Sequence, residues 1–146
     1  METGSRIRLI LWKAHKAVEA VDLASIAATG LGLSDFAVLE ALLHKGPLPV
    51  NIIGDKVLLT SGSISSAVDR LARKQLVKRK QDTSDGRVFH VHLTAEGRKL
   101  IETAFSDHEK NLESVAAILN GQERKELIRL LKKLGSHAKK IKIKCN

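Results

Sequence analysis

The sequence predicts a mainly helical (α+β) fold in which one β-hairpin interrupts a series of helices. Apolar residues recur every three or four positions through most of the chain, and they alternate with polar ones only between residues 77 and 93. With 146 residues, 43% of them hydrophobic and 28% charged, the chain has the size and composition of one compact domain covering residues 1–146. It contains no run of about 18 apolar residues, so no membrane-spanning helix is expected.

Two helices are predicted before residue 47. The first carries apolar residues on one face and ends at residues 29–32, where glycines interrupt the pattern. Ser34 can cap the second helix, and Gly46 followed by Pro47 ends it. The apolar face of the first helix consists of Ile7, Leu11, Ala14, Val18 and Val21, and that of the second consists of Phe36, Leu39, Leu42 and Leu43.

Residues 50–76 predict two short helices joined by a tight turn. The second helix starts at Ser61 or Ser63 and runs to about Gln75. Its inward face is apolar, whereas its outer face combines short hydroxyl side chains in the first turn with arginines behind them. This arrangement is typical of a helix-turn-helix, whose second helix enters the DNA major groove. The inward residues are Ile64, Val68, Leu71 and Leu76, and the outer ones are Ser63, Ser65, Ser66, Asp69, Arg70 and Arg73.

Two runs of alternating residues, 77–81 and 88–93, follow this helix. Asp85 and Gly86 lie between the runs, and both residue types tolerate the positive φ of tight hairpin turns. The pattern therefore predicts a two-stranded wing between Val77 and Leu93. A helix-turn-helix followed by such a hairpin is a winged helix-turn-helix.

Two long helices are predicted after the hairpin. Thr94 can cap the first of them, and Asn120 with Glu123 can form a capping box for the second. The apolar faces of the N-terminal helix and of these last two helices are too extensive to be buried within one small monomer. We therefore expect a homodimer, with a winged helix-turn-helix core at residues 34–97 and dimerisation helices at residues 5–30 and 98–140.

The chain carries 25 Lys and Arg against 16 Asp and Glu, which gives a net charge of +9 and favours a polyanionic partner. Residues 60–99 alone hold nine Lys and Arg and four acids, so the positive charge is concentrated at the predicted helix-turn-helix and wing. Double-stranded DNA is the expected partner. An architectural protein that coats DNA without sequence preference is the alternative. An RNA-binding or ribosomal role is less favoured, because only 3% of the residues are aromatic.

The motifs between residues 59 and 97 resemble those of the multiple-antibiotic-resistance regulator (MarR) family of transcription factors. The resemblance rests on LTSGSI and DRL in the predicted recognition helix, and on LVKR, DGR and VHLTAEG around the wing, the last similar to the family's Leu-Thr-x-x-Gly. It implies a homodimer whose first and last two helices form the interface. Gln75 stands where the family usually has glycine, which leaves open whether the recognition helix ends in a left-handed cap.

The DNA contacts are assigned to the recognition helix and the wing. Short hydroxyl side chains let a helix approach base edges closely, and arginines further along can reach guanine edges or phosphates. At the wing tip, Arg87 resembles the family arginine that enters the minor groove, and Asp85 is expected to orient its guanidinium by a salt bridge. The predicted DNA-binding residues are Ser61, Ser63, Ser65, Ser66, Arg70, Arg73, Lys78, Arg79 and Arg87.

The resemblance also implies a small aromatic or phenolic effector, and Trp12, His15 and Phe36 are the candidates for its pocket. Ordinary core packing is the alternative role for each of the three. His90 and His92 have a spacing that can bind a metal, but no suitably placed further ligand accompanies them. Neither a metal site nor a cofactor is therefore predicted.

The single cysteine, Cys145, rules out an internal disulfide and favours a reducing, cytoplasmic compartment. In this lysine-rich stretch an incidental thiol is expected rather than a redox sensor. No grouping of nucleophile, base and orienting residue stands out along the sequence. The sequence therefore predicts a transcriptional repressor released by an effector, and not an enzyme.

Overall fold

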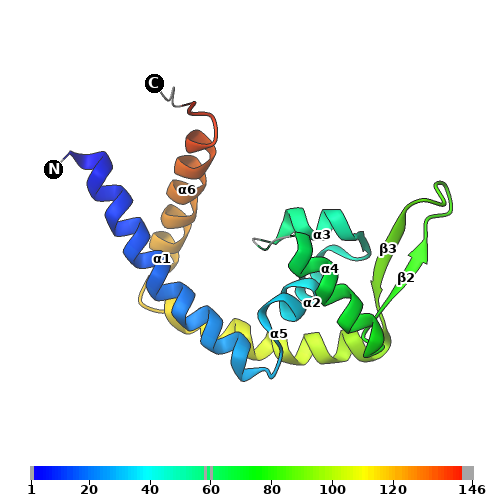
Figure 1. The fold of residues 1–146 in the computed structure, drawn as a ribbon. Coiled ribbons are helices and arrows are strands. Elements are labelled where there is room, and N and C mark those ends of the chain that lie inside the picture. The colour runs from blue at the N-terminus through cyan, green and yellow to red at the C-terminus, as the bar shows by residue number, and fades with distance from the viewer. Residues whose placement is uncertain (1, 58, 60, 143–146) are drawn as a thin grey trace. The chain divides into compact units, whose positions relative to one another are not determined.

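The computed structural model describes residues 2–142 except 58 and 60, so the expectation for Cys145 lies outside the described residues. The described chain forms six helices and three short strands (Figure 1). Two compact units make up the chain, one within Met1–Asn111 and one within Leu112–Asn146. In chain order the elements are α1 (Thr3–Ala28), α2 (Leu33–Lys45), β1 (Leu48–Pro49), α3 (Val50–Lys56), α4 (Ser61–Arg73), β2 (Val77–Gln81), β3 (Phe89–Leu93), α5 (Ala95–Ala116) and α6 (Gly121–Ala138).

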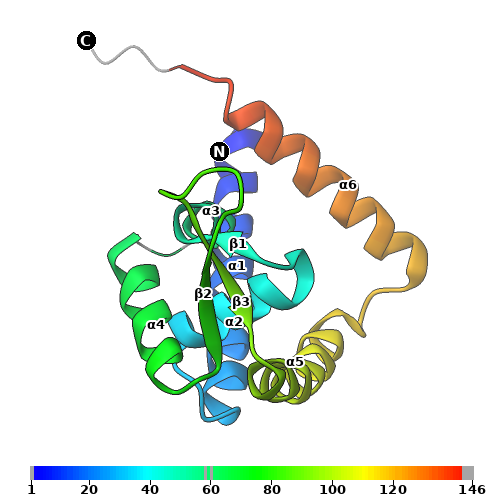
Figure 2. The same cartoon turned by 90° about the vertical axis from the view of Figure 1, so that its right-hand side faces the viewer.

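The wing belongs to a three-stranded antiparallel sheet with the strand order β1-β3-β2 (Figure 2). β2 and β3 pair throughout their length, from Val77 opposite Leu93 onwards, which confirms the predicted hairpin. The sequence did not predict the third strand, in which Leu48 and Pro49 pair with β3. A two-residue strand shows no alternation in the sequence, and a proline is tolerated there because the strand lies at the sheet edge.

The core of the first unit is formed by α2, α3, α4 and the base of the hairpin, together with Ile26 of α1 and Ile101 and Ala104 of α5. The predicted inward residues Ile64, Val68 and Leu71 of α4 are fully buried, and Leu76 is partly buried against the same cluster. Val91 of β3 is also fully buried, so the sheet covers this side of the core. Burial of these side chains fixes the recognition helix and the wing on one common framework.

The start of α2 differs from the sequence-based expectation. α2 begins at Leu33 with Gly32 at the N-cap position, so Ser34 lies inside the first turn and does not cap the helix. Its hydroxyl oxygen instead accepts a hydrogen bond from Arg70 at 3.1 Å. The predicted end is confirmed, because Gly46 has a φ of 75° and its N–H donates to the carbonyl of Leu42.

The two caps predicted after the hairpin are both present. Thr94 Oγ1 accepts the N–H of Gly97 at 3.0 Å, directly at the start of α5. Asn120 and Glu123 form a reciprocal capping box at the start of α6. Each cap satisfies N–H groups that have no partner within the helix itself.

The recognition helix α4 ends in a left-handed cap although it lacks a glycine there. Gln75 has a φ of 60°. Its N–H donates to the carbonyl of Ala72 at 3.0 Å, and the N–H of Leu76 donates to the carbonyl of Leu71 at 2.9 Å, which is the Schellman pattern. The question left open by the sequence is thereby answered, and the cap turns the chain from α4 into β2.

The hairpin loop differs from the predicted Asp-Gly turn. Neither Asp85 nor Gly86 has a left-handed φ, so the tight two-residue turn is not formed. Residues 82–88 instead make a longer loop in which the Asp82 carboxylate accepts the N–H of Ser84 at 2.7 Å and of Asp85 at 3.0 Å. These side-chain hydrogen bonds reverse the chain without positive φ angles.

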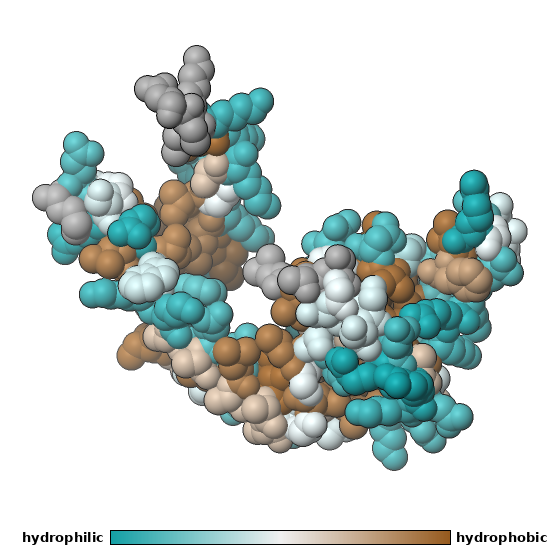
Figure 3. Space-filling model, viewed as in Figure 1, coloured by the Kyte–Doolittle hydropathy of each residue, from teal (hydrophilic) through white to brown (hydrophobic). Residues whose placement is uncertain are grey.

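Both α1 and α6 leave large apolar side chains exposed, as the brown patches in Figure 3 show. They include Ile7, Ile10, Leu11, Val18 and Val21 of α1, and Leu127, Ile128, Leu130, Leu131 and Leu134 of α6. Among the residues that the structure describes, no single helix is long and apolar enough to cross a membrane. Only α1 and α2 taken together reach that length and apolar composition, and the two helices are bent by 88° relative to each other.

Candidate nucleic-acid interface

The first half of α4 presents short polar side chains to solvent. Ser63, Ser65 and Ser66 are exposed, whereas the neighbouring Ile64 and Ala67 are buried. This pattern follows from 3.6 residues per turn, which separates an outer from an inner face. α4 begins at Ser61, whose side chain lies outside the described part of the structure.

Arg70, which the sequence predicts to reach DNA, is instead bound to α2. Its Nε and Nη2 donate to Oδ1 of Asp35 at 3.2 and 2.6 Å, and Nη2 also donates to the hydroxyl of Ser34 at 3.1 Å. Asp35 is only 5% exposed. The hydrogen bond and the negative charge of Asp35 raise the pKa of Arg70. Periodicity could not reveal this pair, because the partners are 35 residues apart.

Arg79 on β2 links the wing to the recognition helix. Its Nη2 donates to Oδ1 of Asp69 at 2.6 Å, but both side chains are exposed and the pair contributes little to stability. Arg73 and Lys78 are exposed and have no acidic partner within the described ranges. The cations near α4 therefore differ in how firmly they are held.

Arg87 lies in the wing loop, where its side chain is 91% exposed. Oδ1 of Asp85 accepts the backbone N–H of Arg87 at 3.0 Å and its Nε–H at 3.2 Å, so the predicted ion pair is present. The same loop is braced by Asp82, whose pKa is lowered because the N–H groups of Ser84 and Asp85 stabilise its charged form. The guanidinium of Arg87 thus projects from a loop held by two carboxylates.

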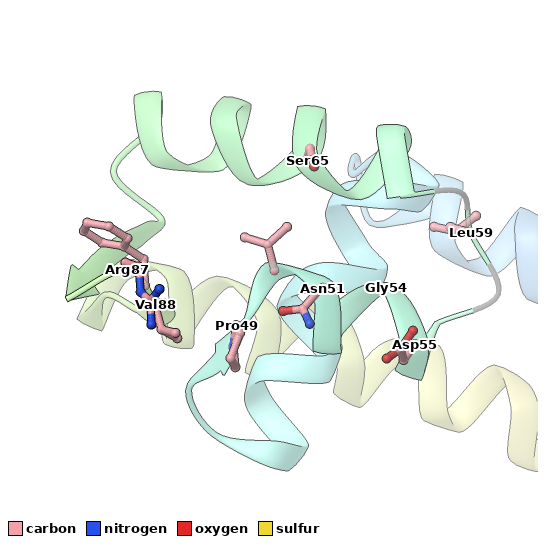
Figure 4. Close-up of a pocket in the computed structure, with 10 residues that line it drawn as sticks. Pro49, Asn51, Gly54, Asp55, Leu59, Ser65, Arg87 and Val88 are labelled. Carbon is pink, nitrogen blue, oxygen red and sulfur yellow. The ribbon is translucent and has the colours of Figure 1, made fainter. Parts of the chain in front are cut away.

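A groove of about 730 Å³ lies between α3, the first half of α4 and the wing. Ser65 and Arg87 both line it, from α4 and from the wing respectively (Figure 4). The groove therefore joins one residue from each of the two elements that the sequence predicts to read DNA. The other lining residues are Pro49, Val50, Asn51, Gly54, Asp55, Leu59, Val88 and Phe89.

His90 and His92 stand opposite lysines of the neighbouring strand. Lys80 pairs with His90, and Lys78 pairs with His92. Partial burial and the positive charges of Lys80 and Lys78 lower the pKa of His92. Nδ1 of His90 lies 3.6 Å from Oδ2 of Asp82. No group of three or more His, Cys, Asp or Glu within the described residues is arranged to hold a metal ion.

The three candidate effector residues do not come together. Trp12 and His15 are exposed on α1, where Nε2 of His15 lies 3.9 Å from Oε1 of Glu19. Phe36 is buried in the core and packs edge-on against His108, with ring centroids 5.0 Å apart. Phe36 thus has the core-packing role that was the alternative expectation.

A Ser–His–Asp series with a buried serine and histidine and a partly exposed aspartate joins α1 to α5, and the sequence did not reveal it. Nε2 of His108 lies 3.2 Å from Oδ1 of Asp22, and Nδ1 lies 3.0 Å from Oγ of Ser25. Nδ2 of Asn111 donates to the same hydroxyl at 2.8 Å. Ser25 is 6% exposed and His108 is 3% exposed, so a substrate could reach the hydroxyl only if the packing opened. We interpret the series as a structural hydrogen-bond network between the two helices.

Known proteins share both the sequence motifs and this fold. The sequence model of the MarR family matches residues 31–89. The HTH-type transcriptional regulator MhqR of Bacillus subtilis is 35% identical over 140 residues, which cover 96% of this chain and 97% of MhqR. A probable transcriptional regulator from Pseudomonas aeruginosa is 29% identical with a TM-score of 0.72, over 91% of this chain and 99% of that one.

A further structural relative is Bordetella bronchiseptica BpsR, whose DNA binding is regulated by 6-hydroxynicotinic acid. It has a TM-score of 0.76 at 24% identity, and the match covers 92% of this chain and 96% of BpsR. The likeness to MhqR extends over nearly the full length of both chains, and the family model covers the helix-turn-helix and most of the wing. This chain belongs to the MarR family of transcriptional regulators.

Proposed function

We propose that this chain acts as a homodimeric repressor that binds a specific sequence of double-stranded DNA in the cytoplasm and is released by a small-molecule effector. The observation that carries the proposal is the groove lined by both Ser65 of α4 and Arg87 of the wing. A recognition helix enters the major groove, and a wing arginine suits the adjacent minor groove. The sugar-phosphate backbone between those two DNA grooves would lie against this part of the protein.

Base reading is assigned to the outer face of α4. Hydroxyl groups on short side chains can donate to or accept from base edges while the helix backbone stays close to them. The cations around this face contact phosphates, and each phosphate neutralised releases condensed counterions. The proposed base-reading residues are Ser61, Ser63, Ser65 and Ser66, and the proposed phosphate contacts are Arg73, Lys78 and Arg79.

Arg87 is proposed to enter the minor groove, with Asp85 as the residue that orients it. A narrow, A·T-rich minor groove has an enhanced negative potential, which attracts an arginine side chain. The high exposure of Arg87 allows it to reach outward, and its hydrogen bonds with Asp85 limit the directions it can take.

The exposed apolar faces of α1 and α6 support the proposed homodimer, because burial of such faces against a second copy removes them from water. Two-fold symmetry then predicts a pseudo-palindromic site with half-sites about 34 Å apart. The effector is proposed to be a small aromatic or phenolic compound, a class to which the 6-hydroxynicotinic acid of BpsR belongs. Trp12 and His15 remain the proposed contacts on α1.

The experiment that tests the proposal is selection of duplex fragments from a random library, followed by competition titration at one fixed salt concentration. The selected site should bind at least about 10³-fold more tightly than random duplex. A ratio near one would defeat the regulator proposal and favour the architectural alternative.

Arg87→Ala tests the wing separately. Without the minor-groove arginine, binding to the selected site should weaken by about ten- to a hundredfold at fixed salt, as expected for one good base-edge contact. Arg129→Ala is the matched control, because it removes the same charge from an exposed pair with Glu126 on α6. If Arg87→Ala binds the selected site as tightly as Arg129→Ala does, the wing has no part in recognition.

A further inference from the structure

Arg70 is the one arginine of the recognition helix whose partner is a buried carboxylate. Asp35 lies in the first turn of α2, and its Oδ1 accepts both the Nε–H and an Nη2–H of Arg70. The second Nη2–H is directed to the hydroxyl of Ser34. These contacts join two helices that are adjacent in the core but far apart in the sequence.

We propose that Arg70 and Asp35 are positioning residues for DNA recognition, which hold α4 on the first turn of α2 and do not themselves contact DNA. The proposal rests on the function proposed above, since it assigns a role within the same DNA-binding surface. It also replaces the expectation from the sequence that Arg70 reads guanine or phosphate.

The hydrogen-bond geometry of Arg70 argues against a base contact. An arginine reads guanine through two adjacent N–H groups, one on each of two nitrogens of the guanidinium. Both such edges include Nη2, and both hydrogens of Nη2 are used by Asp35 and Ser34. To free the Nε–Nη2 edge for DNA, Arg70 would have to leave the Asp35 carboxylate buried without its cation, which is strongly unfavourable. To free the Nη1–Nη2 edge, it would have to give up its hydrogen bond to Ser34.

The position of Asp35 also connects the pair to α1. α1 ends at Ala28, and α2 begins only a short turn later at Leu33. Thr29 closes this turn by donating its hydroxyl hydrogen to the carbonyl of Ile26 at 2.6 Å. The first turn of α2 therefore follows α1 in the chain and is also hydrogen-bonded to Arg70 of α4. A displacement of α1 would move this turn and, through Arg70, the recognition helix.

Asp35→Asn tests the proposal through the sign of its effect. The substitution removes a negative charge, so electrostatics alone would strengthen DNA binding, and still more so if it released Arg70 to a phosphate. A positioning role predicts the opposite. The preference of Asp35→Asn for the selected site over random duplex should fall at least tenfold, while the dependence of binding on salt stays the same.

Arg70→Gln and Arg73→Gln form a matched pair on the same helix. Arg70→Gln should lose site preference without a change in salt dependence. Arg73→Gln should weaken specific and random binding alike, and it should reduce the slope of log K against log salt by about 0.9 for each phosphate that is no longer neutralised. Arg70→Lys keeps the charge but not the planar fork, so it should resemble Arg70→Gln. Circular dichroism and sedimentation confirm that each variant is folded and dimeric.

The outcomes separate the two proposals. If the natural protein shows no preference for any duplex, the proposed regulator function fails. If it shows the preference, but Asp35→Asn binds the site as well or better, or Arg70→Gln reduces the salt slope as Arg73→Gln does, then the positioning role is wrong. Should Asp35→Asn fail to fold, Arg70→Lys decides, because full site preference in that variant would overturn the proposal.

Discussion

Gly97→Ala should destabilise the protein, although helix propensity alone predicts the reverse. Gly97 lies in the first turn of α5, and a Cβ atom built there would lie 1.9 Å from the carbonyl oxygen of Leu76 and 2.8 Å from its carbonyl carbon. Both atoms belong to the backbone, so no side-chain rotation can make room. Within a helix, alanine is otherwise favoured over glycine by about 1 kcal/mol.

The size of the destabilisation follows from the contacts between Gly97 and the backbone of Leu76. An ordinary contact begins at 3.4 Å, so the start of α5 would have to move by about 1.5 Å from Leu76. That shift would break the hydrogen bonds from Thr94 N–H to the carbonyl of Leu76 (3.1 Å) and from the Thr94 hydroxyl to the carbonyl of Gln75 (2.8 Å). With about 1 kcal/mol for each bond and about 1–3 kcal/mol for overpacking, the net loss is about 2–4 kcal/mol after the propensity gain.

Urea unfolding followed by circular dichroism measures this loss, at one protein concentration because the proposed dimerisation would make stability depend on concentration. Gly54→Ala is the control, since it also adds a methyl group to a helical glycine but has no atom within 4 Å of the new Cβ. It should leave stability unchanged or raise it slightly. A Gly97→Ala protein as stable as the natural chain would refute the close approach of α5 to the end of α4.

Two further predictions concern stability. Gln75→Gly should stabilise the protein by about 0.5–1 kcal/mol, because glycine adopts the observed φ of 60° without strain, and a lower urea midpoint would contradict this reading of the cap. Partial burial raises the pKa of Glu40, and the positive charges of His44 and His108 only partly oppose it. The carboxyl group of Glu40 therefore binds its proton more tightly in the folded chain than in the unfolded one. Protonated Glu40 stabilises the fold at acid pH, and this contribution is lost as the pH rises through the folded-state pKa. Glu40→Gln should therefore melt at a higher temperature than the natural chain at neutral pH, and the difference should shrink toward acid pH.

Local patterns predicted most of the fold. Helical periodicity identified the inward face of α4, and residue type identified the caps at Thr94 and Asn120, since both depend only on neighbours within one turn. What escaped prediction depends on distant partners or on very short elements. Ser34 lies inside the first turn of α2, where its hydroxyl accepts a hydrogen bond from the distant Arg70, and β1 exists only because β3 lies beside it.

The candidate site divides in the same way. The exposed serines of α4 follow from periodicity, because an inward and an outward face are defined by the helix alone. The groove beside Ser65 depends on how α3 and the wing fold around α4, and no spacing in the sequence encodes it. Phe36, one of the three residues predicted for an effector pocket, fits the apolar period of α2 and is buried in the core, whereas Trp12 is exposed on α1.

The formal charge also overstates how many arginines can bind DNA. The burial of each arginine's carboxylate partner decides whether that arginine is available. The carboxylate partners of Arg70, Arg79 and Arg87 are 8, 58 and 45% exposed in their side chains. An exposed carboxylate that loses its arginine is solvated by water at once, so Arg79 and Arg87 can exchange it for a phosphate at little cost. The buried partner of Arg70 cannot be solvated in this way. Three arginines that are equivalent in sequence thus divide into two available to DNA and one that belongs to the scaffold.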